Sequence, residues 1–426
     1  MLARARRVPR RARPRASRCR EPARPETDAQ RTADVLTTFV HIDSQYLSID
    51  TMKNCMLIAG AVVAASLSVA ARAEGSVTLY GTIDTGIAYL NHAEGGQSRV
   101  SMSSGALSSN EWGLTGSEGL GGGMNAIFTL ENNFDVASGQ LDGGRLFGSK
   151  AFVGIASDTW GKLTLGRQND PVTDLVQPIT ADAFSGLFAP PGDVDNYDSS
   201  VTFSNAVKWT SAAWHGVTVA AMAAPGGVAG ASGSGLVYSG AMGYADGPLS
   251  AAAGYLHVDN GNAIRSTRGV SSADSFFKSA VSRAYASARS IGIARAGAQY
   301  AIGNVTVGAA FSFSEYRPDA SSTFVHAERY RNGSAFAQWQ AQPALLAIVG
   351  YHFTWSDGDS SARYHQVNVG VDYLLSKRTD LYTTVGYQHA NGFNGSGPAQ
   401  AVIGSYNVDA GTNSQLLAIV GIRHRF

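Results

Sequence analysis

Short stretches in which apolar and polar residues strictly alternate recur along the chain from about residue 76 to its end. The alternation is clearest in residues 77–87, 305–314, 366–373, 381–388 and 416–426. In a β-strand successive side chains point to opposite faces, so a period of two predicts strands with one apolar and one polar side. The chain after residue 73 is therefore predicted to be all-β.

Two-faced strands suit either a soluble sandwich, whose apolar faces meet in a core, or a membrane barrel, whose apolar faces meet lipid. Three features favour the barrel. Short turns such as 376–378 alternate with long polar connections such as 259–290 and 390–414, and the 49 glycines suit a curved wall better than a large core. Aromatic residues also cluster at strand ends, where interfacial girdles are expected: Tyr89, Phe134, Trp209, Tyr255, Tyr351, Phe353, Tyr373 and Phe426.

The fold class is thus predicted as a transmembrane antiparallel β-barrel. At roughly 22 residues per strand and connection, the segment 74–426 would supply about 16 strands, a number that leaves an open aqueous interior. After residue 74 no continuously apolar segment exceeds about 12 residues, which is too short for a helical span.

The amino-terminal part is predicted to divide at residues 51 and 73. Met52-Lys53-Asn54 is a short positive start, residues 56–70 are apolar or small, and Ala71-Arg72-Ala73 has the small-x-small pattern of a signal-peptidase site. Residues 52–73 are therefore predicted to be a signal peptide, with cleavage after Ala73 and a mature barrel domain from Glu74 to Phe426.

Residues 1–51 precede this complete signal and hold nine arginines in their first 20 positions. A basic arm for nucleic acid and a targeting peptide are both conceivable. We favour a simpler interpretation, in which Met52 is the true initiator and residues 1–51 are a mis-annotated upstream extension.

Removing residues 1–73 changes the chemistry of the chain. Both cysteines, Cys19 and Cys55, are lost, and the remaining 20 basic and 26 acidic residues give a net charge of −6. A nucleic-acid partner and stabilising disulfides are therefore not expected. The nine histidines show no metal-ligand spacing, and Gly119–Gly123 lacks the Gly-Lys-Ser/Thr of a phosphate loop. No cofactor, metal or catalytic activity is expected.

Six segments, in order along the chain, resemble the general, non-specific trimeric porins of Gram-negative bacteria, especially the Neisseria, Burkholderia and Bordetella branch. They are SVTLYGTIDTG (76–86), WGLTGSEGLGGGMNAIFTL (112–130), RLFGSKAFVG (145–154), GKLTLGRQ (161–168), NAVKWTS (205–211) and GIRHRF (421–426). The resemblance implies a homotrimer in the lipid of the cell outer membrane that passes small ions and hydrophilic solutes by passive diffusion.

The resemblance also implies that the third external loop folds into the barrel and narrows it. Here that loop should run from Asn169 to about Ser200, with no Lys or Arg, and its acids would form the constriction: Asp170, Asp174, Asp182, Asp193 and Asp195, with Asp198 nearby. Facing charges of opposite sign would create a transverse field across the pore. Alternatively, each of these acids merely solvates an outer loop.

The residues predicted for the facing pore wall are Asp84, Glu111, Arg167 and Lys208. Family members typically carry bases where this chain has Glu111, Thr115 and Thr202, so an anion preference is in doubt. The channel is expected to be weakly anion-selective or even cation-leaning. Strict alternation would point Arg167 towards lipid; a bulge at Gly166 would turn it inwards, or it could lie at the rim.

Phe426, the final residue, is either an ordinary strand end or, as in this family, the signal read by the barrel assembly machinery of the outer membrane. Two further functions stay open. One is an adhesin or structural anchor that uses loops 259–290 and 390–414 as contact surfaces, although the inward set, rich in Gly, Thr, Ser and Asn, does not suggest a plugged lumen. The other is a substrate-specific channel, for which no aromatic slide or basic ladder is evident.

Overall fold

The structure is a computed structural model that describes residues 75–231, 233–260 and 275–426. Residues 1–74, with the predicted signal peptide and the cleavage residues Ala71, Ala73 and Glu74, lie outside the described residues. In the described segments, no helix has both the length and the apolar character that a membrane crossing requires.

The described chain consists mainly of β-strands. The first nine are β1 (Ser76–Ala93), β2 (Gln97–Ser104), β3 (Glu111–Gly121), β4 (Met124–Asn133), β5 (Lys150–Ser157), β6 (Gly161–Gln168), β7 (Phe203–Thr210), β8 (Val217–Ala224) and β9 (Val237–Asp246). They are followed by β10 (Leu249–Asp259), β11 (Ser290–Ile302), β12 (Val305–Arg317), β13 (Glu328–Gln342), β14 (Leu345–Asp357), β15 (Arg363–Leu374), β16 (Thr379–Asn391), β17 (Phe393–Asn394), β18 (Gly397–Pro398) and β19 (Ser414–Arg425).

The helical elements of the described chain are short and lie in the connections. They are α2 (Pro171–Val176) and the 3-10 turns η1 (Asp142–Gly144), η2 (Gln177–Ile179), η3 (Ala181–Ala183), η4 (Gly186–Phe188), η5 (Pro191–Asp193), η6 (Arg283–Tyr285) and η7 (Gly404–Tyr406). Five of these eight, from α2 to η5, lie between β6 and β7.

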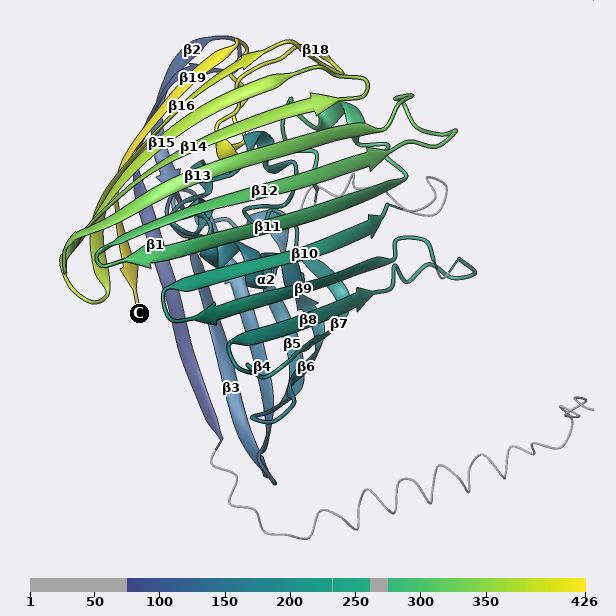
Figure 1. Ribbon diagram of the computed structural model, residues 1–426, viewed down its shortest axis with the longest axis vertical. Coiled ribbons are helices and arrows are strands. Elements are labelled where there is room, and N and C mark those ends of the chain that lie inside the picture. Colours follow the sequence, from purple (N-terminus) through teal and green to yellow (C-terminus); the bar gives the residue numbers. More distant parts are fainter. Residues whose placement is uncertain (1–74, 232, 261–274) are drawn as a thin grey trace, which may run out of the picture. The chain divides into compact units, whose positions relative to one another are not determined.

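The sheet closes on itself as an antiparallel barrel (Figure 1). From β3 to β16 each strand pairs with the next in sequence, and β16 pairs with β19. The ring is completed where β1 pairs with β19, with Thr82 opposite Arg425 and Leu90 opposite Leu417. The sheet has 17 strands, but β2 and β3 both pair with β1, end to end, and occupy one place in the wall. The wall therefore has 16 places, as the sequence predicted, and closure satisfies the backbone groups that a sheet edge would leave unpaired.

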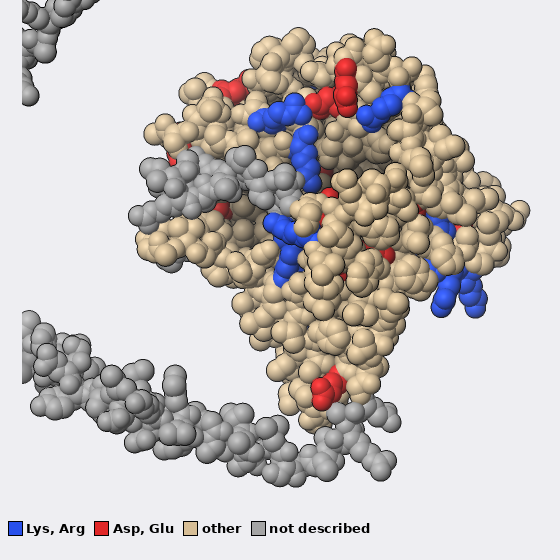
Figure 2. All heavy atoms as spheres, turned by 180° about the vertical axis from the view of Figure 1, so that it is seen from behind, with Lys and Arg blue, Asp and Glu red and all other residues tan. Residues whose placement is uncertain are grey.

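Burial along the strands is the reverse of that in a soluble protein. In β15, Val367 and Val369 are 46% and 45% exposed, whereas Gln366 and Asn368, which alternate with them, are 1% and 0% exposed. An apolar outer face and a polar inner face are what lipid outside and a hydrated interior require. The sandwich interpretation is thereby excluded, and Figure 2 agrees, because charged side chains on that face are sparse and gathered in a few groups.

Connections differ strongly in length between the two ends of the barrel. At one end the turns are short, such as 122–123, 247–248 and 303–304, and at the other the loops are mostly long, such as 134–149 and 169–202. The two ends of the wall meet at the short-turn end, where the backbones of Phe426 and Gly81 exchange hydrogen bonds of 3.0 and 3.3 Å.

Candidate functional site

Residues 169–202, which we call the inward loop, fold into the barrel and begin with a well-capped helix. Asp170 is the N-cap of α2, and its carboxylate accepts the N–H groups of Val172 at 2.8 Å and Thr173 at 3.3 Å. Its Oδ1 also accepts the hydroxyl of Ser239 on β9 at 3.2 Å. Asp170 is 1% exposed, so this predicted constriction acid anchors the loop and does not face the channel.

Arg295 of β11 reaches from the wall into the inward loop. It donates to the carbonyl oxygens of Asn196 at 2.8 Å and Tyr197 at 3.2 Å, and its guanidinium lies 4.0 Å from the centroid of the Tyr197 ring. Arg295 is only 3% exposed. A buried arginine with these partners fixes the loop at one height in the barrel.

Further loop acids hold the inward loop to the wall and to itself. Asp195 accepts hydrogen bonds from the Ser312 hydroxyl and, at 3.0 Å, from Asn332 Nδ2, which lie on β12 and β13. Asp174 forms an ion pair of 2.6 Å with Lys208 on β7. Asp193 accepts two backbone N–H groups of the loop's last turn, from Asp198 at 2.9 Å and Ser200 at 3.3 Å. These acids are structural anchors.

Three loop carboxyls have raised pKa values, because burial disfavours their charged form. Burial raises the pKa of Asp195 to about 6, although the charge of Arg295 opposes the rise. Burial, with the nearby charge of Asp193, raises the pKa of Asp198 to about 7. The pKa of Asp182 is also well above its ordinary value because of burial. Its Oδ2 has no hydrogen-bond partner within the described residues.

The open space lies on the other side of the inward loop, beside the wall of β3–β5. It is a cavity of about 700 Å³ whose charged lining comes from both sides. The loop side contributes Asp182 and Asp198, and the wall side contributes Glu111, Glu131 and Lys150, with Asp142 from the loop after β4. Thr202, at a position where family members typically carry a base, also lines the cavity, so this part of the lining is neutral.

Acidic groups outnumber basic ones in this cavity. Of the six charged residues that line it, Lys150 alone is basic, and it is paired with Glu131 at 2.8 Å. The Glu131 carboxylate also accepts the Tyr80 hydroxyl at 2.7 Å. The Glu111 side chain, in contrast, makes no hydrogen bond or ion pair with any residue that the structure describes. The carboxyl group of Glu111 is therefore available to whatever enters the cavity.

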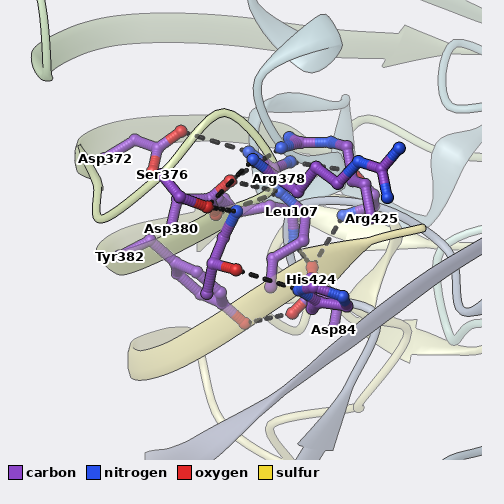
Figure 3. A network of polar contacts seen from close by, with 12 residues as sticks. Asp84, Leu107, Asp372, Ser376, Arg378, Asp380, Tyr382, His424 and Arg425 are labelled. Carbon is purple, nitrogen blue, oxygen red and sulfur yellow. Dashed lines mark hydrogen bonds and ion pairs between the residues drawn. The ribbon is translucent and has the colours of Figure 1, made fainter.

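The remaining predicted wall residues lie elsewhere. The register of β6 against β7 shifts between Gly166 and Gln168, and Arg167 at this bulge donates to the carbonyl oxygens of Gly148 at 2.5 Å and Thr202 at 3.1 Å. Arg167 lines a small adjoining cavity of about 50 Å³. Lys208 forms its ion pair with Asp174 of the inward loop. Asp84 is fully buried beneath the segment after β2 (Figure 3) and does not line the main cavity.

Sequence reasoning missed Glu131 and Lys150 as lining residues. Gly113 lies two residues after Glu111 and so shares its inward face. Glu131 lies opposite Gly113, and Lys150 lies opposite Glu131, so both side chains also point inward.

Phe426 lies outside the cavity at the rim of the barrel, where it is 41% exposed. A side chain added at Gly81 would clash with the Phe426 ring.

The lumen beside β10–β16 is filled, contrary to the expectation of small, polar inward residues. Tyr316 and Tyr330 of the wall pack against Tyr285, and the Tyr330 hydroxyl donates to the carbonyl of Val281 at 2.7 Å. Residues 275–289 and 392–413, expected to be outer loops, supply much of this apolar packing. Their buried apolar side chains cannot serve as the contact surface of an adhesin. Residues 261–274 lie outside the described part of the chain.

Comparisons with known proteins agree with this architecture. Residues 59–392 match the family model described as Gram-negative porin. An outer membrane porin protein of Bordetella pertussis is 40% identical over 138 residues, which are 28% of this chain and 34% of that protein. Outer membrane porin protein 32 of Delftia acidovorans is 27% identical over 379 residues, 87% of this chain and 99% of that protein.

Solved structures show the same fold. An anion-selective porin from Comamonas acidovorans has a TM-score of 0.67 at 20% identity, covering 83% of this chain and 100% of its own. Outer-membrane expressed OmpT of Vibrio cholerae has a TM-score of 0.58 at 16% identity, covering 83% and 98%. These structural likenesses concern the fold alone, whereas the family match covers most of the sequence. The chain belongs to the Gram-negative porin family and is a β-barrel porin of the outer membrane.

Proposed function

We propose that the protein is a passive channel for small hydrophilic solutes and ions whose constriction favours cations. The observation that carries this proposal is the lining of the 700 Å³ cavity, with five acidic residues and one base that is already paired. Carboxylates in a narrow water-filled space attract cations over a screening length of about 8 Å at physiological salt. The solved porin from Comamonas acidovorans is described as anion-selective, so selectivity would differ between the two proteins.

An adhesin or structural anchor is the rival function. The polar-lined cavity beside β3–β5 favours transport, because a mere anchor would not need it. We also propose that three copies assemble, as the resemblance to trimeric porins implies. Planar-bilayer recording of the purified protein tests both points, since it reports an open channel, its ion preference and the number of conducting units. A protein that inserts but never conducts would refute the channel.

The buried carboxyl of Asp198 predicts a pH-dependent selectivity. Its pKa is raised to about 7, so the group is mostly neutral below this pH and negatively charged above it. The reversal potential in a salt gradient should therefore shift towards cations as the pH rises from about 6 to about 8. Asp198→Asn should reduce this shift. An identical shift in wild type and variant would assign the titration to another group.

Phe426 predicts a defect in assembly. We propose that this terminal aromatic residue is read by the outer-membrane assembly machinery, and its exposed position at the rim supports this role. Deleting Phe426 should lower the yield in the outer membrane, while the molecules that do assemble keep the wild-type conductance. Membrane yield and single-channel conductance are the measurements. A normal yield would contradict the proposed signal.

The signal peptide predicts the start of the mature protein. We propose cleavage after Ala73 by signal peptidase, with residues 1–51 dispensable because Met52 begins a complete signal. Amino-terminal sequencing of the protein from outer membranes should begin at Glu74, and expression from Met52 should give the same yield. A mature protein that retains the arginine-rich stretch would overturn this proposal.

A further inference from the structure

The segment Gly105–Asn110 leaves the barrel wall and turns into the lumen. β2 ends at Ser104 opposite Thr85 of β1, and β3 begins at Glu111 opposite Thr82. Six residues thus stand where β1 has only two, and four are in surplus. Surplus residues in one strand cannot join the ladder of hydrogen bonds and must leave the plane of the sheet.

The side chain of Asp84 on β1 holds the middle of this segment. Its Oδ2 accepts the N–H groups of Leu107 at 2.7 Å and Ser108 at 2.8 Å, and its Oδ1 accepts the hydroxyl of Tyr382 on β16 at 2.5 Å (Figure 3). Three donors satisfy the oxygens of this carboxyl group, which explains why a buried polar side chain is tolerated here. Asp84 therefore fixes the segment against the inner face of the wall.

The backbone of Asp84 holds both ends of the segment. Its carbonyl accepts the N–H of Gly105 at 2.9 Å, and its N–H donates to the side-chain oxygen of Asn110 at 2.5 Å. Gly105 has a φ of 76°, in the left-handed region that suits glycine, so the chain can turn sharply where it leaves β2. One residue of β1 thus ties the segment at its start, middle and end.

Arg423 of β19 adds a second attachment. It donates to the Ser108 hydroxyl at 2.8 Å and forms ion pairs of 3.1 Å with both Asp372 and Asp380, two acids that Figure 3 labels. These partners lie on β15 and β16. The segment is consequently fastened to the wall on both sides of the β1–β19 seam.

On its other side the segment touches the inward loop. The hydroxyl of Ser185 donates to the carbonyl of Ala106 at 2.6 Å. Ala106 and Leu107 are 5% and 6% exposed and belong to the buried apolar cluster that includes Leu187 and Phe188 of the loop. The segment thus bridges the wall and the inward loop, and residues 104–109 also line the main cavity.

We propose that Gly105–Asn110 is a second constriction element, which closes the lumen between the inward loop and the β16–β19–β1 wall, and that Asp84 is its positioning residue. Water and solutes are then confined to the cavity beside β3–β5. This inference rests on the proposed channel function, because it concerns the cross-section of that channel.

Deleting residues 106–109 tests the proposal directly. The deletion removes the surplus of four residues and leaves Gly105 opposite Asp84 and Asn110 opposite Ile83, so β2 and β3 can join as one regular strand. Because four is an even number, Glu111 keeps its inward face. We expect a single-channel conductance at least about 1.5-fold higher and passage of larger neutral polymers, since a wider water-filled path opens.

The matched control is deletion of residues 227–230, four largely exposed residues between β8 and β9 that do not line the cavity. It should leave conductance and size limit unchanged. A folded 106–109 deletion, shown by heat-modifiable mobility, with wild-type conductance and size limit would overturn the inference while leaving the channel function intact. A wild-type protein that does not conduct would instead refute the proposed function.

A second set of variants covers the case in which the deletion does not assemble. Asp84→Ala frees the segment and should raise open-channel current noise. Ala106→Cys with Ser185→Cys, in a mature chain that has no cysteine of its own, should allow a cross-link that suppresses this noise. Wild-type noise in Asp84→Ala, or noise unaffected by a completed cross-link, would show that the segment is not held by Asp84.

Discussion

Glu111→Arg is expected to shift the selectivity of the channel strongly towards anions. The substitution replaces an acidic side chain of the cavity lining by a basic one, a change of up to two charge units, at a side chain that has no other partner among the described residues. Two charges at about 7 Å from a passing ion change its energy by about 1 kcal/mol in water. Because the same substitution favours an anion by an equal amount, the ratio of cation to anion permeability should fall roughly 30-fold at low salt.

The measurement is the reversal potential in a salt gradient, recorded at low and at high ionic strength. The shift should shrink at high salt, because mobile ions screen the fixed charge. Glu118→Arg is the matched control, since it makes the same charge change on the same strand, about 23 Å away at 3.3 Å per residue, at an exposed position near a turn. If Glu111→Arg leaves the low-salt reversal potential unchanged, Glu111 does not face the ion path.

The wall could be predicted from the sequence because its signal is local. A period of two gives the orientation of each side chain without knowledge of its partners, and residues such as Glu111 and Gln366 face inward as the alternation indicates. The bulge at Gly166 was foreseeable for the same reason, because regular alternation would have placed Arg167 in lipid. In the structure Arg167 lies at a register shift beside the inward loop. The sequence had left open whether a bulge would turn Arg167 inwards or whether it would lie at the rim.

The roles of the loop acids could not be predicted, because they depend on contacts between distant residues. Asp195 and Asn332 are 137 positions apart, and nothing in the local sequence distinguishes Asp195, an anchor, from Asp182, which lines the cavity. Asp84 was predicted to line the pore wall, whereas in the structure it is buried beneath residues 105–110 and binds their backbone. The surplus residues that cover it are visible only from the pairing of β1 with both β2 and β3.

Replacing Arg295 by methionine should release the inward loop. Methionine keeps an unbranched side chain but removes the donors to the carbonyls of Asn196 and Tyr197 and the one charge that lowers the pKa of both Asp195 and Asp198. Removing one member of a buried charge arrangement costs about 3–5 kcal/mol. The loop should then leave its docked position for part of the time, with higher conductance and larger current fluctuations.

The effect of Arg295→Met should depend on pH in a definite direction. A docked carboxyl with a raised pKa favours the protonated form, so docking is most stable below the ordinary pKa of aspartate, about 3.9, and weakens as the pH rises through the raised value. In wild type that value is about 6 for Asp195, and the substitution raises it further. The variant should differ least from wild type near pH 5, where only the lost hydrogen bonds to the two carbonyls count. It should differ most above pH 7, where the carboxyls must ionise without a counter-charge. Arg331→Met, which removes an arginine paired with Asp357 on the outer face, is the control and should change neither conductance nor noise. Quiet, wild-type currents from Arg295→Met at pH 8 would mean that the loop is held without this arginine.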